Sequence, residues 1–424
     1  MEKIKLVEQH VYKPSSADYA ELDRVCFLSK NLYNATLYAA RQNFFKTGRF
    51  SRYNEINRDF THSSQPDYCA LPRKVSKMTQ MLVDQGITSY LGLASLYQKG
   101  ELENRPGLPK YLKKDGRQVV TYSRQAISVV KKGFVRLSGT SVFIPTNQEN
   151  ISFVRVVPSG TNKNITVEVG YERPIPPVVY GTTAAGDLGI NNLLAVIFPD
   201  RSPIIFSGKP LKSINQFYNK KLAKLKEKQD KSGSTIKSTK RMKRLHAKRK
   251  NKIKIKDYMH KVSREITNQL VSSGVSTFVI GYNKGWKQDV NLGKRVNQSF
   301  VQVPFLMLVD MLRYKCALAG INVVLREEAY TSKCSFLDDE PVEKHARYKG
   351  RRKHRGLFIS SDGRKINADV NSAGNILKKH LIEEEAWTAD LHRNCVEVCS
   401  RPSVFTVKQI KSAKAVNAVK QQST

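Results

Sequence analysis

The stretch GDLGINN, residues 186–192, places one acid, Asp187, between two apolar segments of the chain. Val178 and Val179 precede it, and the run LLAVIF, residues 193–198, follows it. The glycines and asparagines have the turn chemistry of a tight hairpin. The pattern therefore predicts two antiparallel strands, with Asp187 at the end of the first.

Two further segments repeat this arrangement of an apolar element beside an acid. The run INVVL, residues 321–325, leads into Glu327 and Glu328, and Asp369 stands at the head of a helix-like run, residues 370–376. Such carboxylates suggest one metal site, because Mg²⁺ ions held by Asp and Glu oxygens can activate water and neutralise a developing oxyanion in phosphodiester hydrolysis. The alternative is three ordinary surface acids. We favour the metal site because each acid closes a strand or opens a helix in a chain poor in acids.

The choice between the two neighbouring glutamates depends on strand geometry. In a strand, successive side chains face opposite ways, so Glu327 and Glu328 cannot both face the metals. Glu327 shares its face with Leu325. The expected catalytic and metal-binding residues are therefore Asp187, Glu327 and Asp369, with Glu328 as the alternative second acid.

Composition limits the class of protein. A chain of 424 residues can hold two or three domains, and 73 Lys and Arg against 36 acids give a net charge of +37. Such an excess predicts a polyanionic partner. No apolar window long enough to span a membrane and no signal-peptide core are found, which predicts a soluble cytoplasmic protein. The six cysteines form no framework, as expected of reduced thiols.

The basic charge is concentrated in two segments. Residues 214–272 are predicted to form helices, and between 237 and 256 there are eleven Lys or Arg and no acid. An apolar stripe remains for packing, so a merely solvated helix face is the alternative. Charge of this density repels itself unless phosphates lie nearby, which favours nucleic-acid contact. The expected contacts there and in the second basic segment, 344–355, are Lys237, Lys240, Arg241, Lys243, Arg244, Lys248, Arg249, Lys250, Arg351, Arg352 and Lys353.

The first half of the chain changes its periodicity. A helical pattern in the region from about 15 to 105 gives way to a period of two between 119 and 171, punctuated by turn residues. Short strands at this spacing suggest a small barrel, which the strand predicted at residues 3–12 would complete.

These segments resemble the TnpB proteins of IS200/IS605-type transposons, relatives of the compact type V CRISPR nucleases that share a RuvC-like nuclease domain. The resemblance rests on residues 186–189, 283–288, 327–333 and 367–371, and it extends over 183–380. It implies an RNA-guided, metal-dependent DNA endonuclease, encoded by a transposon, that cuts double-stranded DNA next to a short target-adjacent motif. The implied cofactors are two Mg²⁺ ions and a guide RNA derived from the transposon end.

The resemblance also implies the fold, α/β plus β. A RuvC-like (RNase H-like) nuclease domain is expected, preceded by a small β-barrel of the wedge or OB-like type that carries an inserted helical recognition bundle. The location would be a prokaryotic cytoplasm, on the nucleoid when bound to DNA. The expected divisions are the barrel at 1–182, the first two nuclease segments at 183–330 with a basic helical insert at 214–272, a basic insert at 331–368, the third nuclease segment at 369–384, and a tail at 385–424.

The sequence departs from the family between the second and third acids. Most relatives carry a zinc ribbon of two Cys-x-x-Cys pairs there, but residues 331–368 contain only Cys334. A mixed site of Cys334 with His345, His354 and Asp338 is conceivable, yet no pair of ligands has a spacing that would preorganise it. We therefore expect a degenerate ribbon that binds nucleic acid and no zinc.

Two single residues raise further questions. Gly374 stands where many relatives carry an arginine, which predicts that one phosphate contact near the third acid is missing. Trp286, next to a glycine, would either stack on a base or anchor the protein's own core, and the sequence leaves both open.

Two other functions compete with the nuclease. One is a nuclease-inactive, RNA-guided DNA-binding repressor, which the presence of all three acids argues against. The other is a transposase or recombinase accessory protein that joins DNA. A tyrosine recombinase needs a set of Arg, His and Tyr side chains that cannot be placed in this sequence.

Overall fold

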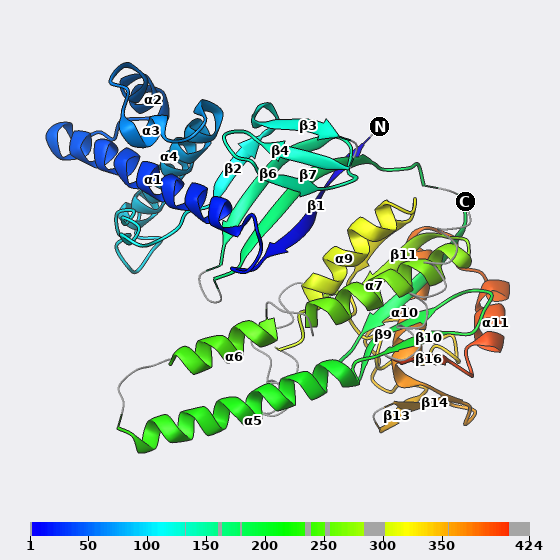
Figure 1. Ribbon diagram of the computed structural model, residues 1–424. Helices are drawn as coiled ribbons and strands as arrows, with labels where there is room; N and C mark the ends of the chain where they lie inside the picture. The colour runs from blue at the N-terminus through cyan, green and yellow to red at the C-terminus, as the bar shows by residue number, and fades with distance from the viewer. Residues whose placement is uncertain are drawn as a thin grey trace. The chain divides into compact units, whose positions relative to one another are not determined.

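The chain divides into two compact units, Glu2–Pro174 and Ile175–Thr424, each built around its own core. The division falls where one strand ends at Pro174, before the next strand begins at Thr182. The computed structural model, drawn in Figure 1, describes residues 2–131, 133–159, 163–178, 180–233, 239–250, 255–283, 302–354 and 356–406.

Two antiparallel sheets form the β part of the N-terminal unit. One has the strand order β1-β7-β6-β2 and the other the order β3-β4-β5. The expected closed barrel is not found in the described part of this unit, because β1 and β2 are the two edges of the first sheet and do not pair with each other. The strands are β1 (Lys3–Tyr12), β2 (Val120–Ser123), β3 (Ile127–Lys131), β4 (Phe134–Leu137), β5 (Phe143–Pro145), β6 (Ile151–Pro158) and β7 (Ile165–Pro174).

Four helices lie between β1 and β2 in the chain. They are α1 (Tyr19–Thr47), α2 (Tyr53–His62), α3 (Pro66–Cys69) and α4 (Arg73–Gln98). The first half of α1 packs Leu22 and Val25 into the core of the sheets, while its second half joins a separate helical cluster through Leu37. Apolar side chains of α1 therefore pack into two separate hydrophobic cores.

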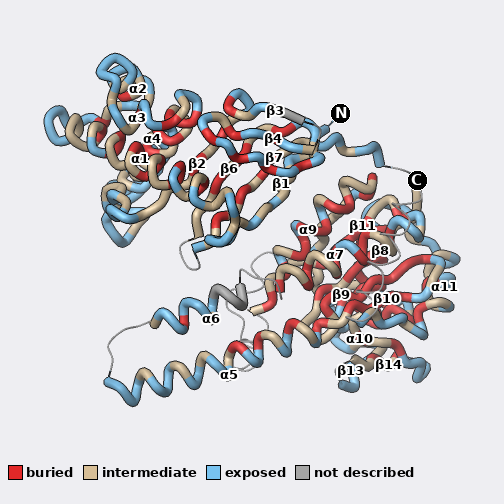
Figure 2. The backbone as a smooth tube through the Cα atoms, in the orientation of Figure 1, coloured by how far each residue is buried: buried red, intermediate tan, exposed pale blue. Residues whose placement is uncertain are grey.

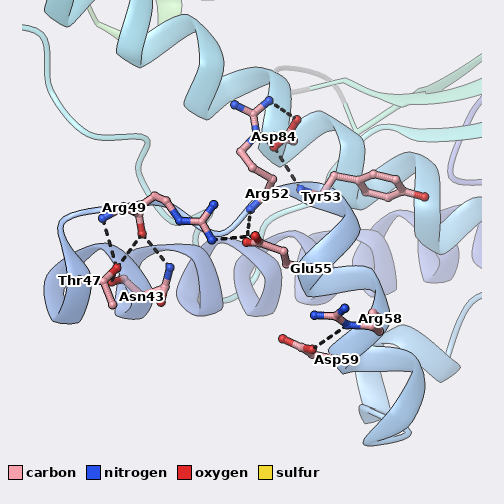
Figure 3. Close-up of polar contacts among 9 residues, drawn as sticks. All are labelled: Asn43, Thr47, Arg49, Arg52, Tyr53, Glu55, Arg58, Asp59 and Asp84. Atoms are coloured by element: carbon pink, nitrogen blue, oxygen red, sulfur yellow. Dashed lines mark hydrogen bonds and ion pairs between the residues drawn. The ribbon is translucent and has the colours of Figure 1, made fainter.

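Polar contacts fix the start of α2 against its neighbours (Figure 3). Glu55 accepts a hydrogen bond from the backbone N–H of Arg52 at 3.1 Å and one from the Arg49 guanidinium at 2.7 Å. Asp84 of α4 accepts from the backbone N–H of Tyr53 at 3.2 Å and also pairs with Arg52. These bonds satisfy the free N–H groups of a helix start, so α2 is held by its first turn.

A six-stranded mixed sheet is the centre of the second unit, in the order β12-β11-β8-β9-β10-β16. The central strand β8 pairs antiparallel with β9 and parallel with β11. The hairpin of β8 and β9 is as predicted, but β8 begins at Thr182, so Val178 lies outside it. The strands are β8 (Thr182–Leu188), β9 (Asn192–Ile197), β10 (Ile204–Ser207), β11 (Val275–Gly281), β12 (Asn322–Arg326) and β16 (Ser403–Phe405).

Helices cover both faces of this sheet. Ala184 and Phe278 pack with α7 (Ile255–Ser272) and α9 (Phe305–Ala317) on one face, and Ala185 and Val279 pack with α10 (Ala368–Glu383) on the other. Neighbouring residues of a strand point to opposite faces, which is why a run of small and apolar residues supplies both cores. Figure 2 shows these strands as the most continuously buried part of the unit.

The remaining helices lie outside this sandwich. The long helix α5 (Lys209–Lys231) follows β10, α6 (Lys240–Lys250) lies beside it, and α11 (Ala389–Val398) precedes β16 (Figure 1). A small antiparallel sheet, β13 (Arg351–His354), β14 (Leu357–Ile359) and β15 (Lys365–Ile366), lies between β12 and α10 in the chain. No helix in the described ranges combines the length and apolar character needed to cross a membrane.

Candidate active site

Asp187 lies near the end of the central strand β8, where it is half-buried. It is two residues from Ala185, so its side chain points to the face of the sheet that α10 covers. Loss of hydration raises the pKa of Asp187 well above its ordinary value, and the negative charges of Glu328 and Asp369 raise it further, while Arg352 lowers it. Two carboxylates from distant segments therefore act on Asp187 at this point.

Glu328, not Glu327, is the glutamate whose charge acts on Asp187. Its carboxylate lies against Gly281 at the end of β11, where a Cβ atom would come within 2.7 Å of Oε1. Its backbone N–H donates to Oδ1 of Asn283 at 2.9 Å. Burial raises the pKa of Glu328 to about 7, and its buried Oε1 has no hydrogen-bond partner among the described residues.

The structure turns Glu327 away, which corrects the expectation that it faces the metals. Its side chain is 73% exposed, and its carboxylate lies 3.9 Å from the Lys379 amine. The expectation assumed that the strand continues through Glu327, but β12 ends at Arg326. Beyond that point the alternation of side chains no longer fixes which of two neighbours faces the sheet.

Asp369 is in the first turn of α10, after the N-cap residue Asn367, whose side chain accepts a hydrogen bond from the backbone N–H of Asp369 at 2.9 Å. Both oxygens of Asp369 are engaged. Asn192 donates to Oδ2 at 2.7 Å, and Arg352 donates to Oδ1 at 3.3 Å. The positive end of the helix dipole favours a carboxylate at this position.

Two buried asparagines of α10 fix the segment that follows Glu328. Asn375 donates to the carbonyls of Thr331 and Cys334 at 2.8 and 2.7 Å, and Asn371 donates to Cys334 at 2.9 Å. Thr331 in turn donates through its backbone N–H and its hydroxyl to the carbonyl of Glu328. The helix that carries Asp369 therefore also anchors the turn that carries Glu328.

Sequence patterns do not identify several of these supporting residues. Asn192 has the character of a turn residue, and nothing in the sequence marks Asn283, Asn371 or Asn375 for a role, although the first two lie within segments that resemble the family. Buried amides that bond to backbone groups across the fold give no periodic signal in a sequence. Gly374 does have a packing reason: a Cβ atom there would come within 2.5 Å of the buried Phe336 ring, so an arginine at 374 would displace that ring.

The donor atoms suit a hard cation, with one qualification. Carboxylate oxygens are the ligands that Mg²⁺ prefers, and the unpartnered Oε1 of Glu328 beside Asp187 is an arrangement that a cation would stabilise. Within the described ranges, however, no three Asp, Glu, His or Cys side chains converge closely enough to enclose one ion. Asn192 and Arg352 hold the Asp369 carboxylate instead, so a bound ion would have to displace or share these contacts.

The insert between the second and third acids is tied together by hydrogen bonds. The backbone N–H and the hydroxyl of Ser361 both donate to Asp338, at 3.0 and 2.6 Å. Lys378 of α10 donates to the carbonyls of Asp339 and Glu340 at 2.8 and 3.1 Å. The Cys334 thiol is buried and donates to the carbonyl of Glu343, and burial raises its pKa.

We expect the purified protein to contain far less than one zinc per chain, because residues 331–368 offer one thiolate where a structural zinc site takes four ligands. Elemental analysis after dialysis would measure this, with Cys334→Ser as the matched control. A stoichiometric zinc in the wild-type protein that is lost in Cys334→Ser would contradict the prediction.

The predicted nucleic-acid contacts fall on α6 and β13. Lys240, Arg241, Lys243 and Arg244 are exposed on α6, while Met242 between them is buried. The three predicted residues of β13 are exposed as well, and one of them, Arg352, pairs with Asp369. Lys237 and Trp286 lie outside the described residues, as do the side chains of Lys248, Arg249 and Lys250.

Two protein families match adjacent segments of the chain, which lie mostly in the second unit. Residues 164–287 match OrfB_IS605, described as a probable transposase, and residues 305–376 match the Cas12f1-like TNB domain.

Relatives with curated descriptions point the same way. The TnpB-like protein ORF457 of Acidianus two-tailed virus is 23% identical over 86% of this chain and 84% of its own length. The CRISPR-associated endodeoxyribonuclease Cas12f2 of a Micrarchaeota archaeon (strain CG1_02_47_40) is 29% identical over 48% of this chain and 37% of its own.

Solved structures resemble the chain more weakly. A Cas12f1–sgRNA–target DNA complex matches 88% of this chain and 98% of its own with a TM-score of 0.36 and 14% identity. The mini-RNA-guided endonuclease CRISPR-Cas_phi3 matches 88% and 92% with a TM-score of 0.43 and 10% identity. These TM-scores are too low for the likeness to support a conclusion. Two families matched on adjacent segments and a TnpB-like relative that spans most of the chain show that it is similar to TnpB-type proteins and to the compact type V effectors.

Proposed function

We propose that this protein is an RNA-guided, metal-dependent DNA endonuclease with a RuvC-like site, encoded by a transposon. The observation that carries the proposal is that burial raises the pKa of Asp187 and that the negative charges of Glu328 and Asp369, from distant segments, raise it further. Like charges held close together in partly buried positions are costly, and carboxylates with a perturbed pKa are frequent at functional sites. The relation to TnpB and to a Cas12f2 endodeoxyribonuclease supports the substrate, DNA.

In this proposal Asp187 and Glu328 are the principal metal ligands, and Asp369 completes the site. Two Mg²⁺ ions would supply an activated water and stabilisation of the leaving oxygen. The chain itself contributes the orientation of the carboxylates. The N-cap of α10 aims Asp369, Gly281 makes room for Glu328, and strand pairing fixes Asp187. Arg352, beside Asp369, is placed to balance negative charge there.

Sequence specificity is proposed to come from a bound RNA. The exposed cations of α6 and β13 suit contact with phosphates, which carry no sequence information. In RNA-guided nucleases, base pairing by the guide reads the target and the protein reads only a short adjacent motif. We assign the same division of labour to this chain.

The test starts with the RNA that co-purifies with the full-length protein. That RNA would be sequenced, and the complex would then be given DNA that carries a matching target beside a randomised segment, with Mg²⁺ or with EDTA. We expect cleavage next to one short motif with Mg²⁺ and none with EDTA, with DNA binding in both. Binding without cleavage under every metal tested would indicate the nuclease-inactive repressor instead.

Neutralising α6 should weaken nucleic-acid binding without changing its sequence preference. The double variant Lys240→Gln, Lys243→Gln removes two exposed charges, so affinity should fall by a similar factor for all targets. The slope of log affinity against log salt should flatten by about 0.9 for each phosphate that the variant no longer neutralises. The matched control, Lys240→Arg with Lys243→Arg, keeps the charge and should keep the slope. An unchanged slope in the glutamine variant would show that α6 does not bind phosphates.

A further inference from the structure

A groove of about 860 Å³ runs between α5 and α6. Its lining on α5 extends from Ser213 to Phe217, Lys221 and Lys228, positions spaced by four or seven residues that share one face of the helix. At 1.5 Å per residue, this face is about 22 Å long, enough for several nucleotides. Figures 1 and 2 show the two helices side by side, with exposed residues along much of α5.

Side-chain contacts connect the two helices that form the groove. The Tyr218 hydroxyl and the His246 ring nitrogen Nδ1 lie 3.2 Å apart, and Met242 of α6 is buried. These contacts join α5 to α6 beside the groove.

The floor of the groove is apolar and contains an exposed aromatic ring. Ile214 and Leu225 of α5 and Leu245 of α6 line it together with Phe217, which is 55% exposed. The Lys221 amine lies 4.5 Å from the centre of the Phe217 ring. A half-exposed aromatic ring with a cation over it is a group on which a planar base can stack in exchange for the cation.

The rim of the groove is strongly basic. Five cations line it, and no acid is among the lining residues. None of the five forms an ion pair with an acid in the described part of the chain, and the acid Glu227 on α5 is paired with Lys231. The charge is therefore left for a polyanion. The five are Lys221, Lys224, Lys228, Arg241 and Arg244.

We infer that this groove binds an unpaired stretch of the RNA, with a base stacked on Phe217 and the flanking phosphates on the five cations. The inference rests on the RNA partner of the proposed function. Duplex DNA keeps its bases paired and stacked, whereas folded RNA offers loops and bulges whose bases stack on aromatic side chains. The lining presents mainly aliphatic, aromatic and cationic groups, so stacking and charge would do the recognition, with little selection among bases.

The test separates stacking from charge. Full-length protein freed of RNA would be titrated into a labelled U12 oligoribonucleotide and into a 12-mer of the same charge with abasic sites. Phe217→Ala should weaken U12 binding about tenfold, since it removes the ring on which a base stacks, and should change abasic binding little. Phe217→Trp should restore U12 binding. Thermal unfolding of both variants should match wild type, because Phe217 is exposed.

Control variants and control ligands distinguish a failure of the groove assignment from a failure of the proposed function. Phe45→Ala removes a phenylalanine that is 60% exposed and lies beside Arg41 on α1 of the other unit, and it should leave U12 binding unchanged. An equal loss in Phe45→Ala, or no loss in Phe217→Ala, would overturn the groove assignment. The same loss seen only with dT12 would assign the groove to single-stranded DNA. Wild-type protein that retains no RNA from cells and does not bind U12 would instead defeat the proposed function itself.

Discussion

Glu328→Gln is expected to abolish DNA cleavage, while Glu327→Gln should cleave within about twofold of wild type. Glutamine keeps the shape of the side chain but removes the charge that a divalent cation requires. Groups that act on charge developing in a transition state are worth on the order of 10²–10³-fold in rate, so the loss at Glu328 should be at least of this size. Cleavage of guide-matched DNA under single-turnover conditions measures both variants.

The pair is a matched experiment because both residues lose the same charge at adjacent positions. Glu328 lies against Gly281 beside Asp187, whereas Glu327 is 73% exposed. Asp187→Ala and Asp369→Ala should behave like Glu328→Gln. DNA binding should remain close to wild type in all of them, because affinity comes mainly from the basic surface. An active Glu328→Gln together with an inactive Glu327→Gln would show that Glu327, and not Glu328, is the required carboxylate.

Replacing the guide segment of the bound RNA is expected to redirect cleavage to a new DNA sequence. If the protein read bases itself, a compact helix with Arg, Asn and Gln aimed at base edges would be expected, as in helix-turn-helix proteins. The exposed cations of α6 are instead spread along one helix rich in lysine and arginine. Such a surface binds the phosphate backbone of a nucleic acid without distinguishing its bases. We therefore expect base pairing between the bound RNA and the DNA to determine the target sequence.

The measurement compares three preparations of the same full-length protein: with its native RNA, with an RNA whose guide segment has been replaced, and after RNase treatment. We expect the protein with its native RNA to cleave the native target, and the protein with the replaced guide segment to cleave only the new target. After RNase treatment we expect no sequence-specific cleavage. RNA-free protein that still cuts one defined sequence would show that the side chains themselves read DNA.

Some features of this protein were determined by local sequence. The glycines and asparagines of residues 186–192 direct a hairpin, and β8 and β9 form there with Asp187 near the end of the first strand. Asn367 is an N-cap, which is why Asp369 stands at the start of α10. Period-two patterns yielded strands, and the density of charge on α6 yielded an exposed helix. Each of these follows from neighbours in the chain.

Other features were decided only by tertiary structure. The sequence suggested a closed barrel, but whether sheet edges meet depends on the twist and length of strands far apart in the chain, and β1 and β2 remain edges. The sequence also favoured Glu327. The choice of Glu328 depends on where β12 stops and on the space that Gly281 leaves on the adjacent strand. The Asp369 carboxylate accepts hydrogen bonds from Asn192 and Arg352, and both of these residues come from other segments of the chain. Alternation predicts orientation only while a strand continues, and contacts between distant segments depend on the packing of the whole unit.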